Sequence, residues 1–303
     1  MTRTTWVLAV SLLVALIAPL AWGMVEWLRS RRHAPQAAST TTWQWKAVLG
    51  SMLLYVLAFN LTFFVQELFL VVPKALTPGL QPTLYHNNHG WEGEHPLAAL
   101  FQGTGALATF VVGLLCLWAA RRGAGRTPAR RMALVWMAYC GLLMALPQVV
   151  IGALSGASDV GMAMDYLGLS LPAKTLAAGI ALAAIPWVAL SLRPPVLEVA
   201  EDVSSSATPA TGAKRIFMLV TLPALLAVVA ILPFRVPREW LEVVLLPVLV
   251  TVPGIAWMQA GAWRAKEAMP SVRGRWPLAG LLLATLALLV VFQWILRPGI
   301  AFH

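Results

Sequence analysis

The sequence predicts an all-α integral membrane protein, a bundle of about eight transmembrane helices with both chain termini on the outer side. Hydrophobic residues make up 59% of the 303 residues and charged residues only 11%, whereas about a quarter of the residues in soluble domains are charged. Long uncharged segments recur along the chain, and about 20 apolar residues suffice to cross the roughly 30 Å hydrocarbon core of a bilayer as a helix. We therefore expect residues 1–303 to form one transmembrane domain.

Eight segments have the required length and composition. They are Trp6–Trp27, Lys46–Val72, Leu97–Ala120, Met132–Leu154, Leu169–Leu192, Ile216–Pro233, Leu241–Trp263 and Pro277–Leu296. The first segment is similar to a signal peptide, with Arg3 ahead of its apolar stretch. However, more basic residues follow this segment than precede it, and the segment is long for a signal peptide. We interpret it as a retained anchor and not as a cleaved signal.

The distribution of basic residues predicts the orientation of the helices. The segments that follow the first, third, fifth and seventh spans contain most of the Arg and Lys residues, and the alternate segments contain few. Because cytoplasmic loops are enriched in these residues, the chain is expected to lie in the plasma (inner) membrane with its termini and the loop of residues 85–96 on the non-cytoplasmic side. The formal charge of +10 reflects these short basic segments. They form no continuous basic face, so nucleic acid is not an expected partner.

Two connections contain too little apolar surface to fold alone. Residues 30–42 are small, polar and basic, and residues 198–213 are rich in Ser, Thr and Pro. Such composition is typical of disordered segments, and we interpret 198–213 as a flexible cytoplasmic linker. Cys116 and Cys140 lie within apolar segments, where free Cys behaves as a small hydrophobe.

Polar residues within the predicted spans gather toward the outer side. Glu67 lies six residues before Pro73, roughly 9 Å below the outer helix end at a rise of 1.5 Å per residue. A charge at mid-bilayer costs about 2.5–3.5 kcal/mol, so ionisable groups there usually face a cavity or a partner. Lys174 is the matching base, and an ion pair with Glu67 would offset much of that cost; snorkelling to the interface is the alternative. The expected substrate-binding residues at this end are Asn60, Gln66, Gln102, Thr104, Gln148 and Lys174.

The loop between the second and third spans is rich in histidine. His86, His89 and His95 lie within ten residues, and Glu92 lies between the last two. Imidazole and carboxylate groups suit zinc or another first-row divalent metal. We therefore predict that the three histidines are metal ligands, with Glu67 as a fourth ligand or as the base for a metal-bound water. The alternative is a loop or lid at the headgroup level without metal.

The resulting hypothesis is a membrane-embedded enzyme or binding protein with an outward-facing polar pocket. Its expected catalytic residues are Glu67, His86, His89, Glu92 and His95. A pocket in the outer leaflet suits a lipid-like or membrane-associated substrate. A small-molecule transporter or channel, or an accessory subunit of a membrane complex, are the alternatives. The chain contains neither a Walker loop nor a Gly-x-Ser-x-Gly elbow, which disfavours nucleotide-driven motors and ordinary serine hydrolases.

Overall fold

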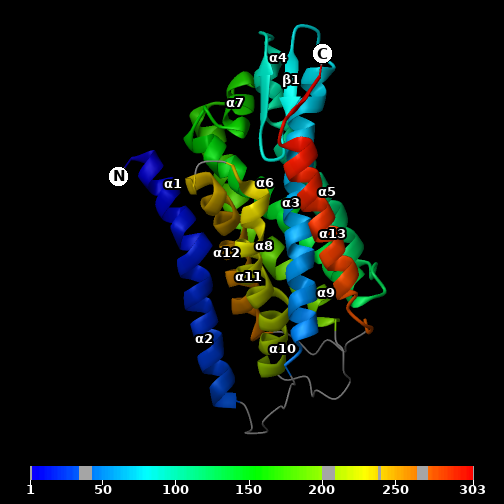
Figure 1. The fold of residues 1–303 in the computed structure, drawn as a ribbon. Helices are drawn as coiled ribbons and strands as arrows, with labels where there is room; N and C mark the ends of the chain where they lie inside the picture. Colours follow the sequence, from blue (N-terminus) through cyan, green and yellow to red (C-terminus); the bar gives the residue numbers. More distant parts are fainter. Residues whose placement is uncertain (1, 34–42, 200–208, 238–239, 265–271, 303) are drawn as a thin grey trace.

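The computed structural model of the chain describes residues 2–33, 43–199, 209–237, 240–264 and 272–302. In these ranges eight helices are long and apolar enough to cross a membrane, which agrees with the predicted number and indicates a multi-pass membrane protein. The helices run side by side along the long axis of the molecule (Figure 1). A helix shorter than these, α7 (Asp159–Tyr166), lies at one end of the bundle.

Several of the eight spans combine more than one helical segment. In chain order they are α1 (Arg3–Leu12) with η1 (Leu13–Ile17) and α2 (Ala18–His33); α3 (Trp45–Ala75); α4 (Leu97–Phe101) with α5 (Thr104–Arg121); α6 (Pro128–Leu154); α8 (Leu171–Ser191) with α9 (Arg193–Leu197); α10 (Pro209–Ile216) with η2 (Phe217–Thr221) and α11 (Leu222–Arg235); α12 (Trp240–Ala262); and α13 (Leu278–Val290) with η3 (Val291–Leu296). The start of α6 shows how the local sequence determines where a helix begins. The Thr127 hydroxyl accepts a hydrogen bond from the Arg130 backbone N–H, and Pro128 occupies the first turn, where no backbone donor is needed.

The centre of the bundle is filled by α3 and α6, the two most buried spanning helices in the described part of the chain. Tyr55, Trp136 and Tyr139 are fully buried there, and the Tyr55 and Trp136 rings meet edge to face with centroids 4.6 Å apart. Both tyrosine hydroxyls bond to one residue of α12. The Tyr55 hydroxyl lies 2.6 Å from the Thr251 hydroxyl, and the Tyr139 hydroxyl donates to the Thr251 carbonyl at 2.5 Å. Because every polar atom of this group has a partner, the group can pack in an apolar interior.

Glycine allows α5 and α6 to pack closely. A Cβ at Gly141 would lie 2.6 Å from the Thr109 carbonyl oxygen and 2.8 Å from the Gly113 Cα. A Cβ at Gly113 would in turn lie 2.8 Å from the Leu142 backbone nitrogen. Small residues at such crossings let two helix backbones approach each other in a membrane.

The structure differs from an all-α fold at one end, where it contains a three-stranded antiparallel sheet in the order β2-β1-β3. The strands are β1 (Gln81–Leu84), β2 (His89–Glu92) and β3 (Ile300–Ala301). The Tyr85 N–H donates to the Asn88 carbonyl at 2.9 Å and closes the turn of the β1–β2 hairpin. The asparagines and glycines of this loop indicated turns, but strands of four residues with no apolar alternation gave no strand signal. The third strand comes from the far end of the chain.

The hairpin, the start of α1 and the C-terminal strand lie at the same end of the bundle (Figure 1). The sequence predicts that both termini and the histidine loop lie on one side of the membrane, and in the structure they lie toward one end of the bundle. The side of the membrane that this end faces stays a prediction from the arginine distribution.

The predicted flexible linker, residues 198–213, lies only partly within the described residues. Its central residues 200–208, like residues 34–42 of the first polar connection, lie outside the described residues. On one flank, Val199 forms a parallel bridge with Val272, and the Val272 N–H donates to the Glu198 carbonyl at 3.0 Å. On the other flank, Pro209 starts α10. The two flanks of the linker therefore contain a backbone bridge and the start of a helix, and its flexibility stays a prediction.

The close approach of α5 and α6 can be tested by adding one methyl group. We expect Gly141→Ala to destabilise the protein by about 1–3 kcal/mol, as overpacking of a tight contact usually does. Gly179→Ala is the matched control, since a Cβ at Gly179 on α8 meets nothing within 4 Å, and Ala is the better helix former. Thermal unfolding of both variants in the same detergent measures the difference. An unchanged midpoint for Gly141→Ala would contradict the crossing described here.

Candidate functional site

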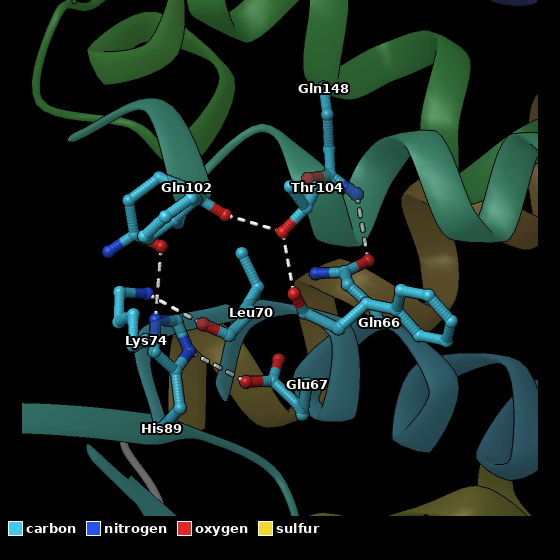
Figure 2. A network of polar contacts seen from close by, with 10 residues as sticks. Gln66, Glu67, Leu70, Lys74, His89, Gln102, Thr104 and Gln148 are labelled. Carbon is cyan, nitrogen blue, oxygen red and sulfur yellow. Dashed lines mark hydrogen bonds and ion pairs between the residues drawn. The ribbon is translucent and has the colours of Figure 1, made fainter. Parts of the chain in front are cut away.

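A buried pair of ionisable side chains lies at the hairpin end of α3. The Glu67 carboxylate lies 2.8 Å from Nδ1 of His89, and the two side chains are only 6% and 7% exposed. The other ring nitrogen of His89, Nε2, lies 3.0 Å from Oε1 of Gln102. Figure 2 shows the imidazole between the carboxylate and the amide. Glu67 was expected to be a buried carboxylate near the histidine loop, and the structure brings it together with one of the three histidines.

Three separate elements position this group. Glu67 projects from α3, His89 is the first residue of β2, and Gln102 lies in the bend between α4 and α5. The α5 helix approaches α3 closely after this bend, because a Cβ at Gly105 would lie 2.8 Å from the Gln66 carbonyl oxygen. The glycine therefore helps to place Gln102 beside the hairpin.

Lys74 is a further member of the site that the sequence analysis missed. It is fully buried, donates from Nζ to the Leu70 carbonyl at 2.8 Å, and lies 4.6 Å from the centroid of the Trp91 ring. Its ammonium group interacts electrostatically with Glu67 and with Asp159. The predicted span ends at Val72, before Pro73, and so leaves Lys74 outside the helix. The helix continues to Ala75, so the last turn carries the lysine inward. Transmembrane helices can continue through proline, and this rule could have placed Lys74 inside the helix.

Gln66 and Gln148 meet on another side of α3. Nε2 of Gln148 donates to Oε1 of Gln66 at 2.8 Å and to the Met144 carbonyl at 3.1 Å. Both glutamines line a cavity of about 300 Å³ between α3, α6, the start of α7 and α12. The lining residues are Phe63, Gln66, Met144, Gln148, Ile151, Ala157, Ser158, Asp159, Val160 and Leu246. One part of the wall is apolar and the other part presents amide, hydroxyl and carboxylate groups.

The ion pair between Lys174 and Glu67 that the sequence predicted is not present, because each residue has another partner. Nζ of Lys174 pairs with the carboxylate of Asp165 on α7. The reason is geometric, since Asp165 lies near the end of α7 and the short connection to α8 places this acid beside the lysine. Glu67 instead receives its partner from the hairpin.

Two other predicted wall residues make local contacts. Asn60 is buried and donates from Nδ2 to the Val56 carbonyl one turn earlier in its own helix at 2.8 Å. The Thr104 hydroxyl lies 2.5 Å from the Phe69 carbonyl and 2.6 Å from the Phe101 carbonyl. It connects the start of α5 to α3 (Figure 2).

The other histidines of the loop lie apart from His89. His86 is buried at the hairpin turn, with Nε2 3.1 Å from the Val236 carbonyl, and the adjacent Asn87 donates to the Arg235 carbonyl at 2.6 Å. Nδ1 of His95 accepts a hydrogen bond from the Leu97 N–H at 3.2 Å. The turn of the hairpin is therefore fixed to the end of α11.

The three-histidine metal site predicted from the sequence is not assembled in this structure. Throughout the described ranges, no three side chains of His, Cys, Asp or Glu form a group that could hold a metal ion. Each imidazole makes its own contacts, and Glu92, expected among the catalytic residues, is exposed on β2. The hairpin separates the rings because β2 directs His89 toward α3 while the turn directs His86 toward α11.

The contacts of His89 suit a group that exchanges a proton. In the present arrangement both ring nitrogens face oxygen atoms, which is the pattern of a protonated imidazole that donates twice. A half-turn of the Gln102 amide would present its NH₂ group to Nε2 and would fit the neutral ring. The site can therefore satisfy both protonation states without moving the backbone.

No protein-family model, no curated protein and no solved structure matches this chain.

The Glu67–His89 contact can be tested by a double-mutant cycle. We expect Glu67→Gln and His89→Asn each to destabilise the protein by about 3–5 kcal/mol, because each variant leaves a buried polar partner poorly compensated. The double variant should cost less than the sum of the two single changes. Denaturant or thermal unfolding in detergent gives the four stabilities.

Glu92→Gln is the control for this cycle, because Glu92 is an exposed carboxylate three residues from His89. We expect it to change the stability by no more than about 0.5 kcal/mol. Additive effects of Glu67→Gln and His89→Asn would show that the two side chains do not interact.

Proposed function

We propose that this chain is a membrane-embedded acid–base enzyme that binds the polar part of a lipid-like molecule at the hairpin end of the bundle. In this proposal Gln66 and Gln148 bind the substrate, and Glu67 and His89 hold and transfer the proton. The observation that carries the proposal is the buried contact between Glu67 and His89. Glu67 lies on the same turn of α3 as Gln66, which lines the cavity.

The cavity supports a substrate with one polar and one apolar part. Its volume of about 300 Å³ lies at the lower end of the range of roughly 300–1,000 Å³ for small-molecule sites. Phe63 and Ile151 contribute to an apolar wall, whereas Gln148 and Asp159 present hydrogen-bonding groups. A headgroup with hydroxyl or amine donors matches these acceptors.

Lys74 connects the cavity electrostatically with the buried pair. Its ammonium interacts with Asp159, which lines the cavity, and with Glu67, which contacts His89. In this proposal a charge bound in the cavity acts on Lys74, and Lys74 in turn acts on Glu67. In a low-dielectric interior such interactions are weakly screened. This coupling is the means by which binding would influence the proton on His89.

The centre of the bundle favours a site that opens on one side over a transport pathway. The fully buried cluster of Tyr55, Trp136, Tyr139 and Thr251 lies between the hairpin end and the opposite end, and its polar atoms bond to one another or to the backbone. A pathway through the bundle would have to disrupt this packed group. A divalent metal is not required by this mechanism, and elemental analysis of the purified protein tests the alternative with zinc.

Identification of the bound molecule tests the binding part of the proposal. We expect the full chain, purified in a mild detergent, to retain an amphipathic small molecule that native mass spectrometry detects and organic extraction releases for identification. Gln66→Ala combined with Gln148→Ala should lose this molecule, because both amides line the cavity. The matched control is Gln293→Ala, which also removes a hydrogen-bonded glutamine but does not line this cavity.

Glu67→Gln tests the acid–base part. This variant should retain the molecule in unreacted form. When the molecule extracted from the variant is given to the wild-type protein, the wild type should convert it to a product that mass spectrometry distinguishes. Two results would overturn the proposal. One is equal retention of the molecule by the Gln66/Gln148 variant, and the other is flux of the molecule across proteoliposomes with no chemical change, which would identify a transporter.

A further inference from the structure

A long apolar groove runs beside the first spanning helix, in the half of the bundle away from the hairpin. Residues of η1 and α2 form one side, η2 and α11 form the second, and α12 forms the third. The groove encloses about 570 Å³, within the roughly 300–1,000 Å³ typical of ligand sites. Its polar side chains are Thr221 and Gln259, which bond to each other at 2.7 Å. The remaining lining is apolar, so the groove suits a hydrocarbon group.

The length of the groove corresponds to one leaflet of a bilayer. Its lining extends along the first helix from Leu16 to Trp27, which is about 16 Å at 1.5 Å per residue and about half of the roughly 30 Å hydrocarbon core. Trp27 and Trp263 both line it near the ends of their helices. Tryptophan prefers the headgroup level, so these rings mark the end of the groove that meets the membrane surface.

That end of the groove is basic. The guanidinium of Arg31 lies 4.2 Å from the centroid of the Trp27 ring, which itself lines the groove. Arg31 and the adjacent Arg32 are exposed. Both side chains can therefore contact a group that lies at the mouth of the groove.

Two further arginines lie at the same end and share one carboxylate. The buried Glu26 pairs with Arg29 at 2.9 Å and with Arg264 at 2.8 Å. The second pair joins α2 to the end of α12. In the described part of the chain, Glu26 thus joins two arginines at this end, and Arg31 stacks on Trp27 at the mouth of the groove.

We propose that this groove binds an acyl chain of a phospholipid with an anionic headgroup, and that Arg31 and Arg32 bind its phosphate. Arginine is well suited to phosphate because its planar guanidinium can donate two parallel hydrogen bonds. The first helix has the least buried spanning window in the described part of the chain, at 11%. A lipid in the groove adds apolar contact between this helix and the rest of the bundle. The proposal does not depend on the site at the hairpin end.

Titration with defined lipids tests the proposal. The full chain, purified in detergent and stripped of lipid, is titrated with phosphatidylglycerol or with phosphatidylcholine that carries the same acyl chains, and native mass spectrometry reports the bound fraction. We expect one phosphatidylglycerol per chain and a preference of about tenfold or more over phosphatidylcholine, since each basic residue near the surface attracts anionic lipid.

Two pairs of variants separate the groove from the headgroup site. Ala256→Phe fills the groove and should abolish the bound lipid, whereas Ala183→Phe, at an exposed position of α8, should leave it unchanged. Arg31→Gln with Arg32→Gln should remove the preference for phosphatidylglycerol. Arg126→Gln with Arg130→Gln, at exposed positions before and within the first turn of α6, should retain it. The arginine variants change no buried residue, so they remain informative if Ala256→Phe fails to fold.

Three results would overturn the proposal. They are equal binding of the two lipids by the wild-type chain, unchanged preference in the Arg31/Arg32 variant, and a dimer in the wild type that Ala256→Phe converts to a monomer, which would show that a second copy fills the groove. The variant with Gln66→Ala and Gln148→Ala should bind phosphatidylglycerol like the wild type. Failure of the proposal for the hairpin end is thereby distinguished from failure of this one.

Discussion

A carboxylate that is removed from water within a membrane protein needs a compensating partner, and the contact of Glu67 with His89 provides it. The helix that carries the acid is central to the bundle, and the imidazole belongs to a hairpin outside the bundle. Since breaking a buried pair leaves an uncompensated polar group, this contact favours a docked hairpin. Docking then places the other hairpin groups. The turn meets the end of α11 through Asn87, and Trp91 lies over the ammonium of Lys74.

The sequence predicted the helices of this protein better than their polar contacts. Apolar windows identify spanning helices because the bilayer imposes one length and one composition on all of them. The same reasoning correctly placed Glu67, Gln66, Gln102 and Gln148 toward one end. It paired Glu67 with Lys174 because it considered only residues within the spans, whereas the partners of both residues come from connections, namely a hairpin and a short helix.

The histidine loop shows why spacing alone could not define a metal site. Three imidazoles within ten residues can converge only if the backbone turns them to one point. Here the β1–β2 pairing makes His89 the first residue of a strand and leaves His86 in the turn, so the rings face different helices. That pairing is stabilised by β3, which joins Leu84 to Ile300 across more than two hundred residues of sequence. A contact of this range leaves no periodic signal near the loop.

The two ends of the bundle use the same interaction, a cation over a tryptophan ring, in different ways. Lys74 lies over Trp91 with no exposed surface, and its ammonium also donates to the backbone of its own helix. That cation contributes to the docked hairpin and to the electrostatics of the cavity. Arg31 lies over Trp27 at the surface, where its guanidinium stays accessible to an anion. Burial decides between the two roles, because a desolvated cation is restricted to its neighbours in the fold while an exposed one can accept a new partner. The hairpin end therefore suits chemistry on a small polar group, and the opposite end suits attachment of a lipid.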